Sequence, residues 1–326
     1  MTTTRILGRS GIEVGAIGVG TWAIGGRMTI GGDDYGWGAV DDDTSVQALR
    51  VAVDLGATLI DTADAYGTGH AERVIARALG ARRDQLVWAS KWGNTYDEAT
   101  RELTGSDPTP GYARRALEAS LCRLGTDRLD LWQLHLSDLD PALAEDLVAL
   151  CEQLVDEGLI RGYGWSTDDP ARAAVFAAGP RCTLVQHALN VLGDAPEMLA
   201  LCEAQNLASV NRSPLAMGLL SDKITADTVL PPGDVRRTGP GWLSWFTDGR
   251  PTPEFLARRD AVRDVLASDG RTLAQGALAW NLARSPRTVP IAGIRTVAQA
   301  QENIGTLAVA PMTAEEFAQI EALLRQ

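Results

Sequence analysis

The sequence predicts a (β/α)8 barrel, because eight short apolar runs alternate with longer amphipathic stretches along its 326 residues. The short runs are mostly continuous in their apolar residues, which is typical of strands covered on both faces. A helical pattern follows nearly every run, with Ser or Asp near several of its starts and Gly after several of its ends. Strand-then-helix units in this number favour a closed parallel barrel surrounded by helices.

The expected strands are, in chain order, 14–20, 57–63, 85–91, 129–135, 160–166, 182–187, 208–213 and 288–294. The expected helices are 43–55, 69–79, 109–124, 141–158, 170–178, 194–205, 272–284 and 297–306. Before them, residues 4–14 resemble a hairpin with its turn at Ser10-Gly11, placed to close the bottom of the barrel. We expect the whole chain, 1–326, to fold as a single domain.

Two segments are longer than a minimal barrel needs. Residues 92–110 are predicted to be a polar loop after the third strand, and residues 219–250 a Gly-, Pro- and Asp-rich loop after the seventh. By this count both lie on the face where the strands end, so we expect lids or pocket walls. The alternative is that both are surface insertions without a role in the site.

Composition excludes several classes of function. With 30 basic and 42 acidic residues the net charge is −12, and no Lys/Arg cluster is present, so nucleic acid and anionic membranes are not expected partners. The longest apolar runs are far below the roughly 20 residues that span a bilayer, and the N-terminus has no signal-peptide core. Four scattered cysteines indicate buried free thiols in a reducing cytoplasm. Three histidines are too few for a His-rich metal site.

Asp61, Tyr66, Lys91 and His135 lie at or just past the ends of three predicted strands, in TLIDTADAY, LVWASK and LDLWQLH. Since parallel barrel strands end at one mouth, an acid, a phenol, an ammonium and an imidazole are expected there together. Taken singly, each residue also has a structural interpretation: a capping Asp, a loop aromatic, a solvated Lys and a core His. Their joint placement favours a catalytic site.

These four side chains suit the donation of a proton to a carbonyl oxygen. A free phenol has a pKa of about 10, too high for efficient acid catalysis near neutrality, and the Lys91 ammonium is expected to lower the pKa of Tyr66. Asp61 would keep Lys91 charged, and His135 would hydrogen-bond the substrate oxygen. Because no side chain supplies a hydride, a nicotinamide cofactor is implied. The sequence therefore predicts an oxidoreductase that acts on a carbonyl.

With these motifs in view, the sequence resembles the aldo-keto reductase family. The resemblance rests on DTADAYGTGHAE, the strand ending in Lys91, LDLWQLH, GYGWST, VQHALN, RSPLAMGLL and GIRTVAQAQENIG, which occur in this order within residues 5–325. It implies a (β/α)8 barrel that binds NADP(H) in an extended form without a Rossmann domain. In agreement, no G-x-G-x-x-G opens a helix after a strand, and the sequence has no P-loop.

The resemblance assigns Asp61, Tyr66, Lys91 and His135 to the family's catalytic tetrad, with Tyr66 as the general acid. It implies a substrate pocket formed by Trp22, Tyr66, Trp92 and His135, and no metal. The implied cofactor contacts are Gly20, Thr21, Trp22, Asp61, Ser166, Thr167, Gln186, Arg212, Ser213, Leu215, Gly218, Gly293, Arg295, Gln299 and Asn303.

Three groups of these cofactor contacts have distinct expected roles. Ser166 and Gln186 match the positions that orient the nicotinamide carboxamide. Ser213, Leu215 and Gly218 match the loop around the pyrophosphate, where backbone N–H groups approach the anion. Arg295, Gln299 and Asn303 are spaced four apart on one helix face and match the adenosine site, with Arg295 suited to the 2′-phosphate of NADP.

Two residues depart from the family pattern. Thr167 stands where the family often has Asn, so an altered hydrogen bond to the nicotinamide is expected. Arg212 stands where many members have an aromatic residue on the nicotinamide ring. We hypothesise that its planar guanidinium stacks there or reaches a phosphate.

The predicted function is the NADPH-dependent reduction of an aldehyde or ketone to an alcohol, and two substrate classes stay open. One is a small aldehyde, and the other is a ketone on a sugar or polyketide-type natural product. The nine tryptophans weakly favour a large apolar ligand. The alternative is a cofactor-binding regulatory or sensor subunit similar to potassium-channel β subunits. The oligomeric state is open, a homo-oligomer included.

Overall fold

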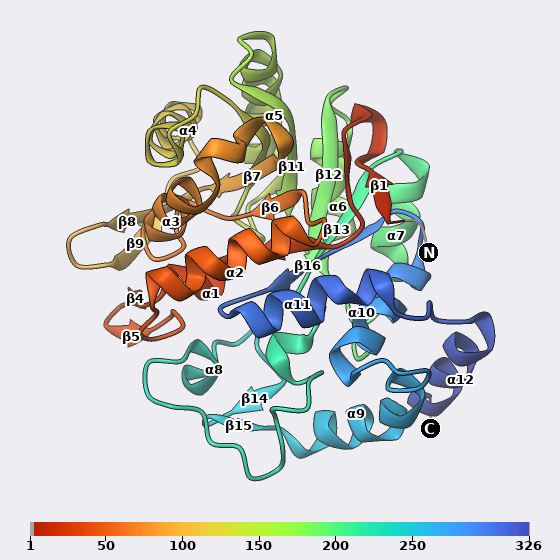
Figure 1. Cartoon of the computed structure of the whole chain (residues 1–326). Coiled ribbons are helices and arrows are strands. Elements are labelled where there is room, and N and C mark those ends of the chain that lie inside the picture. Colours follow the sequence, from red (N-terminus) through yellow and green to blue (C-terminus); the bar gives the residue numbers. More distant parts are fainter. Residues whose placement is uncertain (1–2, 326) are drawn as a thin grey trace.

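A computed structural model describes residues 3–325 of the chain. Eight parallel strands form a closed barrel, which confirms the predicted fold class (Figure 1). In chain order they are β3 (Gly18–Gly20), β6 (Leu59–Asp61), β7 (Val87–Trp92), β10 (Leu129–Leu134), β11 (Ile160–Ser166), β12 (Cys182–Ala188), β13 (Ala208–Arg212) and β16 (Thr288–Gly293). Each strand pairs with the next, and β16 pairs with β3 to close the ring.

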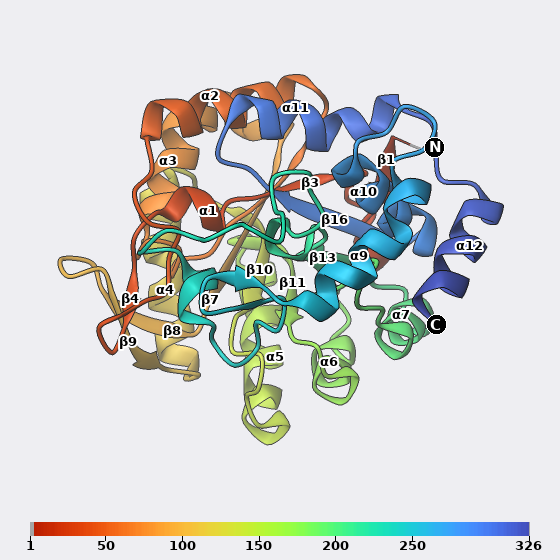
Figure 2. The same cartoon turned by 90° about the horizontal axis from the view of Figure 1, so that it is seen from below.

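Helices surround the barrel at the expected places (Figure 2). They are α2 (Asp42–Asp54), α3 (His70–Leu79), α4 (Pro110–Leu124), α5 (Pro141–Asp156), α6 (Pro170–Ala177), α7 (Pro196–Ala204), α10 (Leu273–Arg284) and α11 (Val297–Gly305). Their starts follow from the sequence: Thr109, Asp140 and Asp169 accept backbone N–H groups just before a proline at the first helical position. Two helices that the sequence analysis did not predict, α9 (Pro253–Leu266) and α12 (Ala314–Leu324), pack against each other.

The barrel bottom is closed by the predicted N-terminal hairpin. Strands β1 (Thr4–Ile6) and β2 (Glu13–Gly15) pair antiparallel, and a short 3-10 turn over Gly8–Ser10 joins them. Leu7, Ile12 and Val14 form one buried cluster with apolar residues of the barrel strands, among them Leu59, Val87, Leu131, Leu184, Val210 and Ile291. In Figure 1 this hairpin lies at the opposite end of the barrel from α8, β14 and β15.

We expect Leu7→Ala to lower the free energy of unfolding by about 2–5 kcal/mol, because it leaves a cavity under the barrel where Leu7 is fully buried. Ile6→Ala is the matched control, since Ile6 is 61% exposed, and it should change stability little. Urea unfolding of both variants checks this. Equal midpoints for the two variants would show that the hairpin does not seal the core.

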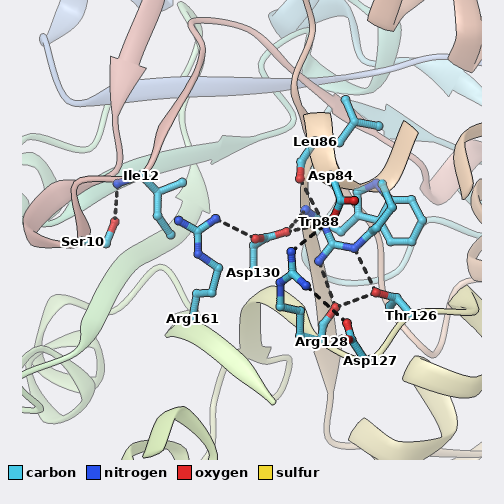
Figure 3. A network of polar contacts seen from close by, with 11 residues as sticks. Ser10, Ile12, Asp84, Leu86, Trp88, Thr126, Asp127, Arg128, Asp130 and Arg161 are labelled. Atoms are coloured by element: carbon cyan, nitrogen blue, oxygen red, sulfur yellow. Dashed lines mark hydrogen bonds and ion pairs between the residues drawn. The ribbon is translucent and has the colours of Figure 1, made fainter. Parts of the chain in front are cut away.

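A buried carboxylate, Asp130 at the start of β10, ties three barrel strands together (Figure 3). Its Oδ2 accepts the backbone N–H of Trp88 in β7 at 2.9 Å and pairs with Arg83 Nη1 at 2.8 Å. Its Oδ1 accepts from Arg161 Nη1 in β11 at 2.9 Å. Two guanidinium groups compensate this buried charge, and the pairing fixes β7, β10 and β11 side by side. Two of the predicted catalytic residues lie at the far ends of β7 and β10.

The expectation of a polar loop over residues 92–110 is wrong. The segment forms a hairpin of β8 (Asn94–Asp97) and β9 (Glu102–Ser106), which joins β4 (Thr29–Ile30) and β5 (Asp33–Asp34) in a four-stranded sheet. Strand β9 pairs with a segment more than 60 residues earlier in the chain, so local patterns could not reveal it. The hairpin is therefore a structured wall rather than a flexible lid.

The segment 219–250 contains the short helix α8 (Val235–Thr238) and begins the small hairpin of β14 (Phe246–Thr247) and β15 (Arg250–Pro251). It meets the loop after β3 in several places: Val235 N donates to Gly36 O at 2.8 Å, and Trp242 Nε1 donates to Tyr35 OH at 3.0 Å. Seen from below, this segment passes across the end of the barrel (Figure 2). Within residues 3–325, no helix has both the length and the apolar character needed to cross a membrane.

Candidate active site

The structure brings the four predicted catalytic residues together at the mouth of the barrel. Lys91 Nζ lies 2.6 Å from Asp61 Oδ2, 2.7 Å from the carbonyl oxygen of Thr62 and 3.2 Å from Tyr66 OH. The rings of Tyr66 and His135 meet edge to face with centroids 5.7 Å apart. Asp61 ends β6, Lys91 lies in β7 and His135 directly follows β10, so neighbouring strands supply three of the four.

Burial and charge set the protonation states of this cluster. Burial raises the pKa of Tyr66 above its ordinary value, and this outweighs the lowering by the Lys91 ammonium. The expected net lowering of the pKa of Tyr66 is therefore wrong in direction, although the Lys91 contribution has the expected sign. For Lys91, burial acts to lower the pKa, but Asp61 and Tyr66 together raise it above its ordinary value. Tyr66 is thus a protonated phenol at neutral pH, beside a charged ammonium.

His135 is a neutral imidazole at neutral pH. Burial, followed by the positive charges of Lys91 and Arg212, holds its pKa well below its ordinary value. Its backbone N–H donates to Trp92 O at 2.8 Å, and its ring Nδ1 lies 3.5 Å from Asn94 Nδ2. A neutral imidazole donates one hydrogen bond and accepts one, so His135 can orient a substrate oxygen without adding charge to the site.

Asp61 has further partners that the sequence analysis missed in part. Its Oδ1 accepts from Gln186 Nε2 at 2.8 Å and from Gln133 Nε2 at 3.2 Å, and Gln186 also donates to Gln133 Oε1 at 3.0 Å. Gln186 was predicted as a cofactor contact, but Gln133 was not singled out. A feature of the sequence could have identified Gln133, because it is a polar residue inside the apolar run LDLWQLH, two residues before His135. These amides hold the carboxylate in place for Lys91.

A cavity of about 750 Å³ opens above the tetrad and reaches the start of α11. Aromatic and apolar residues form one part of its wall, including Trp22, Tyr35, Trp37, Leu103 and Trp242. Trp22 lies at the centre of this wall, stacked on Tyr66 with centroids 6.0 Å apart. Of the predicted site residues the cavity is lined by Gly20, Thr21, Trp22, Asp61, Tyr66, His135, Ser166, Gln186, Arg212, Ser213, Leu215, Gly218, Gly293, Arg295, Gln299 and Asn303.

Three predicted site residues do not line this cavity: Lys91, Trp92 and Thr167. Lys91 is fully buried and reaches the site only through Asp61 and Tyr66. Trp92 is fully buried in the core, where it stacks on Trp132 with centroids 6.4 Å apart. The prediction that Trp92 forms part of the substrate pocket is therefore wrong, because at this strand end its side chain points away from the barrel mouth and into the core. Thr167 is also fully buried, and its hydroxyl donates to Ser137 O at 2.7 Å and accepts from Asp169 N at 3.2 Å. Its side chain serves the turn after β11.

Arg212 forms an ion pair with Asp168, whose other oxygen accepts the backbone N–H of Ala188 at 2.7 Å. Both side chains line the cavity. The guanidinium is thus held at the ends of β12 and β13, and its charge contributes to lowering the pKa of His135. Stacking of Arg212 on a nicotinamide ring stays a prediction.

The loop after β13 has an unusual backbone. Ser213, Ala216 and Met217 adopt left-handed conformations with φ of 53°, 45° and 55°, and Gly218 has φ of 94°. Such conformations cost about 1–3 kcal/mol each for residues other than glycine and cluster where a fold binds a ligand. Arg236 fastens this loop by donating to Met217 O at 2.9 Å, while its guanidinium lies over the Trp37 ring.

Arg295 lies at the far end of the cavity, before α11. Its guanidinium donates to Trp37 O at 3.3 Å and Ala39 O at 2.8 Å, so it also connects α11 with the loop after β3. Gln299 Oε1 accepts the backbone N–H groups of Arg295 and Thr296 and closes a capping box. Asn303 Nδ2 donates to Gly293 O at 3.2 Å. Gln299 and Asn303 lie four residues apart on α11, whereas Arg295 precedes the N-cap Thr296 and lies outside the helix. All three nevertheless line the cavity.

A second histidine, His187 on β12, is fully buried and allows a test of how stability depends on pH. Its Nε2 lies 2.7 Å from Ser209 Oγ and its Nδ1 lies 3.0 Å from Ala188 O. Burial lowers the pKa of His187 to about 4. In the unfolded chain, the His187 ring binds a second proton near pH 6.5. The contribution of the neutral ring to the free energy of unfolding is therefore complete above pH 6.5 and is lost as the pH falls from 6.5 toward 4.

We therefore expect the free energy of unfolding of the native protein to fall relative to that of His187→Gln by about 3 kcal/mol between pH 7 and pH 4. Because both proteins contain His135, its contribution to the pH dependence of unfolding cancels in the comparison. Denaturant unfolding at pH 7, 5.5 and 4 measures the difference. A constant difference across this range would mean that His187 titrates normally in the folded state.

Comparisons with known proteins agree with this geometry. The model of the Aldo/keto reductase family matches residues 16–325. The aldo-keto reductase YhdN of Bacillus subtilis is 31% identical over 305 residues, which are 89% of this chain and 84% of that relative. The NADH-specific methylglyoxal reductase of Escherichia coli is 28% identical, with 92% of each chain covered.

Solved structures give the same result. The glycerol dehydrogenase AKR11B4 of Gluconobacter oxydans has a TM-score of 0.82 at 28% identity, covering 99% of this chain and 96% of its own. An aldo-keto reductase of Klebsiella pneumoniae in complex with NADPH has a TM-score of 0.71 at 26% identity, with the same coverage.

Proposed function

Because the chain belongs to the aldo/keto reductase family, we propose that it reduces an aldehyde or ketone to an alcohol, with NADPH as the cofactor. The observation that carries this proposal is the contact of Lys91 with both Asp61 and Tyr66 at the floor of the cavity. A protonated phenol beside a buried ammonium is the arrangement that a proton donor to a carbonyl oxygen requires.

The residues of the cavity fit an extended dinucleotide. Ser166 and Gln186, near Asp61, would orient the nicotinamide carboxamide, because a hydroxyl and an amide both hydrogen-bond an amide. The left-handed turns of 213–218 favour an anion cradled by backbone N–H groups. Arg295 would bind the 2′-phosphate with the N–H groups that Trp37 and Ala39 leave available. When bound, the nicotinamide supplies the hydride that no side chain can provide.

The chain's own residues handle the proton. Tyr66 would transfer its hydroxyl proton to the substrate's carbonyl oxygen as negative charge develops there. The Lys91 ammonium, 3.2 Å from that hydroxyl, would stabilise the phenolate that remains. Asp61 keeps Lys91 protonated, since it raises the pKa of Lys91 against the effect of burial. His135 would hydrogen-bond the same carbonyl oxygen and place it against Tyr66.

The aromatic wall favours a substrate larger than a small aldehyde. Trp22 contacts the rings of Tyr35, Trp37 and Trp242 with centroids 5.8–6.1 Å apart, and Trp242 is 46% exposed at the rim. A planar or apolar group beside the carbonyl would bury these surfaces. We therefore place a ketone on a ring-containing natural product ahead of a small aldehyde such as a glyoxal.

Paired NADPH and NADH oxidation across a panel of aldehydes and ketones tests the proposal. The expected result is carbonyl-dependent oxidation of NADPH, with higher kcat/KM for ring-bearing ketones than for methylglyoxal. Binding of NADPH without turnover of any carbonyl, together with a stable complex with another protein, would instead support a regulatory subunit.

We expect Arg295→Ala to raise the KM for NADPH by about 10-fold to 100-fold, because a charged hydrogen bond contributes roughly 1.5–3 kcal/mol. The KM for NADH should change much less, since NADH has no 2′-phosphate. An equal loss for both cofactors would show that Arg295 acts through its contacts with Trp37 and Ala39 and not on the phosphate.

A further inference from the structure

We infer that Asn94 is a positioning residue which fixes the ring proton of His135 on Nε2 and so directs a hydrogen-bond donor into the cavity. The expected effect of Asn94 on turnover rests on the proposed carbonyl reduction. The position of the ring proton does not, and it can be measured independently. Asn94 was not among the residues that the sequence analysis singled out.

The fold places the Asn94 side chain against the histidine. Asn94 is the first residue of β8, two positions after β7 ends, and its Nδ2 lies 3.5 Å from His135 Nδ1. The backbone of this corner is fixed, because Trp92 O accepts the His135 N–H at 2.8 Å and Asn94 O accepts the Tyr112 hydroxyl from α4 at 2.5 Å. Both Asn94 and His135 line the cavity.

This contact selects one tautomer of the imidazole. In the orientation that the Asn94 amide has in the structure, Nδ2 faces His135 Nδ1. Because an amide N–H only donates, this contact favours a lone pair on Nδ1. A neutral imidazole carries a single N–H, and that proton then lies on Nε2. A distance of 3.5 Å is at the long end of hydrogen bonds, and such bonds in catalytic sites tighten in the complex with substrate.

The surroundings of the ring support a neutral donor. The positive groups that act on His135 are Lys91 and Arg212, and with burial they keep its pKa low, so a second ring proton is disfavoured. The Tyr66 phenol meets the ring edge to face. Among residues 3–325, none hydrogen-bonds His135 Nε2, and the half-buried ring has surface on the cavity.

The tautomer decides what the substrate meets. With the proton on Nε2, His135 and Tyr66 present two donors to one carbonyl oxygen, which lowers the energy of the negative charge that develops there. With the proton on Nδ1, a lone pair would face that oxygen and repel it. Asn94 therefore acts on the reaction through His135, without contact to the reacting atoms.

The test uses the two nearly isosteric substitutions Asn94→Asp and Asn94→Leu in the full chain. Because the chain has three histidines, nitrogen-15 NMR resolves their ring nitrogens, and His135→Gln identifies the signals of His135. We expect Nε2–H in the native protein. In Asn94→Asp the carboxylate can only accept a hydrogen bond, and it would accept one from Nδ1–H. The tautomer should therefore change to Nδ1–H, and the pKa of His135 should rise. Asn94→Leu removes the donor and should give a mixture.

Turnover should follow the tautomer. We expect kcat to fall by about 10-fold to 100-fold in Asn94→Asp, by analogy with residues that orient metal-binding histidines, with the KM for NADPH unchanged. A shift of the lower limb of the kcat–pH profile should accompany the rise in the pKa of His135. If Asn94→Asp does not fold, the native tautomer and the Asn94→Leu mixture decide the matter.

Two outcomes separate this inference from the proposed function. A native Nδ1–H tautomer, or one unchanged in both variants, would overturn the inference even if the protein reduces carbonyls. A native Nε2–H tautomer that changes as expected, in a protein that reduces no carbonyl in the panel, would sustain the positioning of His135 and reject the proposed reaction.

Discussion

Tyr66→Phe is expected to lower kcat for carbonyl reduction by about 10²-fold to 10⁴-fold, the range of a lost general acid. The variant keeps the ring that stacks on Trp22 and meets His135, and it loses only the hydroxyl that lies 3.2 Å from Lys91 Nζ. Single-turnover reduction with saturating NADPH measures this loss directly at the chemical step.

Cofactor affinity is the internal control for that variant. Because the phenol hydroxyl is assigned to the substrate oxygen, the Kd for NADPH should stay within about threefold of the native value, which is under 1 kcal/mol. A variant that turns over at the native rate would remove Tyr66 from the mechanism. A variant that loses NADPH binding would show instead that the hydroxyl holds the cofactor site together.

Lys91→Met is expected to affect both stability and turnover. Lys91 is fully buried and compensates the buried carboxylate of Asp61 at 2.6 Å. Removing one partner of a buried ion pair leaves an uncompensated charge, which costs about 3–5 kcal/mol of the free energy of unfolding. Activity should fall as well, because Tyr66 loses the ammonium that stabilises its phenolate. Denaturant unfolding and kcat give the two effects separately.

The double variant Asp61→Asn, Lys91→Met is the control for the charge argument. With both charges removed, Gln133 and Gln186 still have an amide to hydrogen-bond, so much of the lost stability should return while activity stays low. If the double variant is as unstable as the sum of the single ones, the stabilising role of Lys91 is in packing rather than in compensating Asp61.

The barrel and the clustering of the four candidate residues could be predicted from the sequence because both follow from local patterns. Strands covered on both faces are continuous apolar runs, and the C-terminal ends of parallel strands meet, so Asp61, Lys91 and His135 could be brought together without coordinates. Helix starts could be predicted from capping aspartates such as Asp140 and Asp169. A continuous apolar run does not show which way the side chain at the end of a strand points. For this reason Trp92 was predicted in the pocket although it packs in the core.

What the sequence could not give depends on contacts between distant segments. The pairing of β9 with β4 turned a presumed loop into a wall, and it brings Asn94 and Leu103 to the cavity. The direction of the pKa shift of Tyr66 depends on how far burial outweighs the Lys91 charge, and burial follows from the whole fold. Gln133 stands out in the sequence as a polar residue within an apolar run, but its partner, Asp61, lies on another strand.

Hydride transfer from NADPH and proton donation by Tyr66 can be tested in one experiment. NADPH deuterated at C4 of the nicotinamide, on the transferred face, is mixed with the best ketone of the panel, and the alcohol is analysed by mass spectrometry and NMR. We expect one deuterium on the former carbonyl carbon. The native protein should form this alcohol rapidly, and Tyr66→Phe should form it at least about 100-fold more slowly. An alcohol without deuterium, or equal rates for the two proteins, would contradict this expectation.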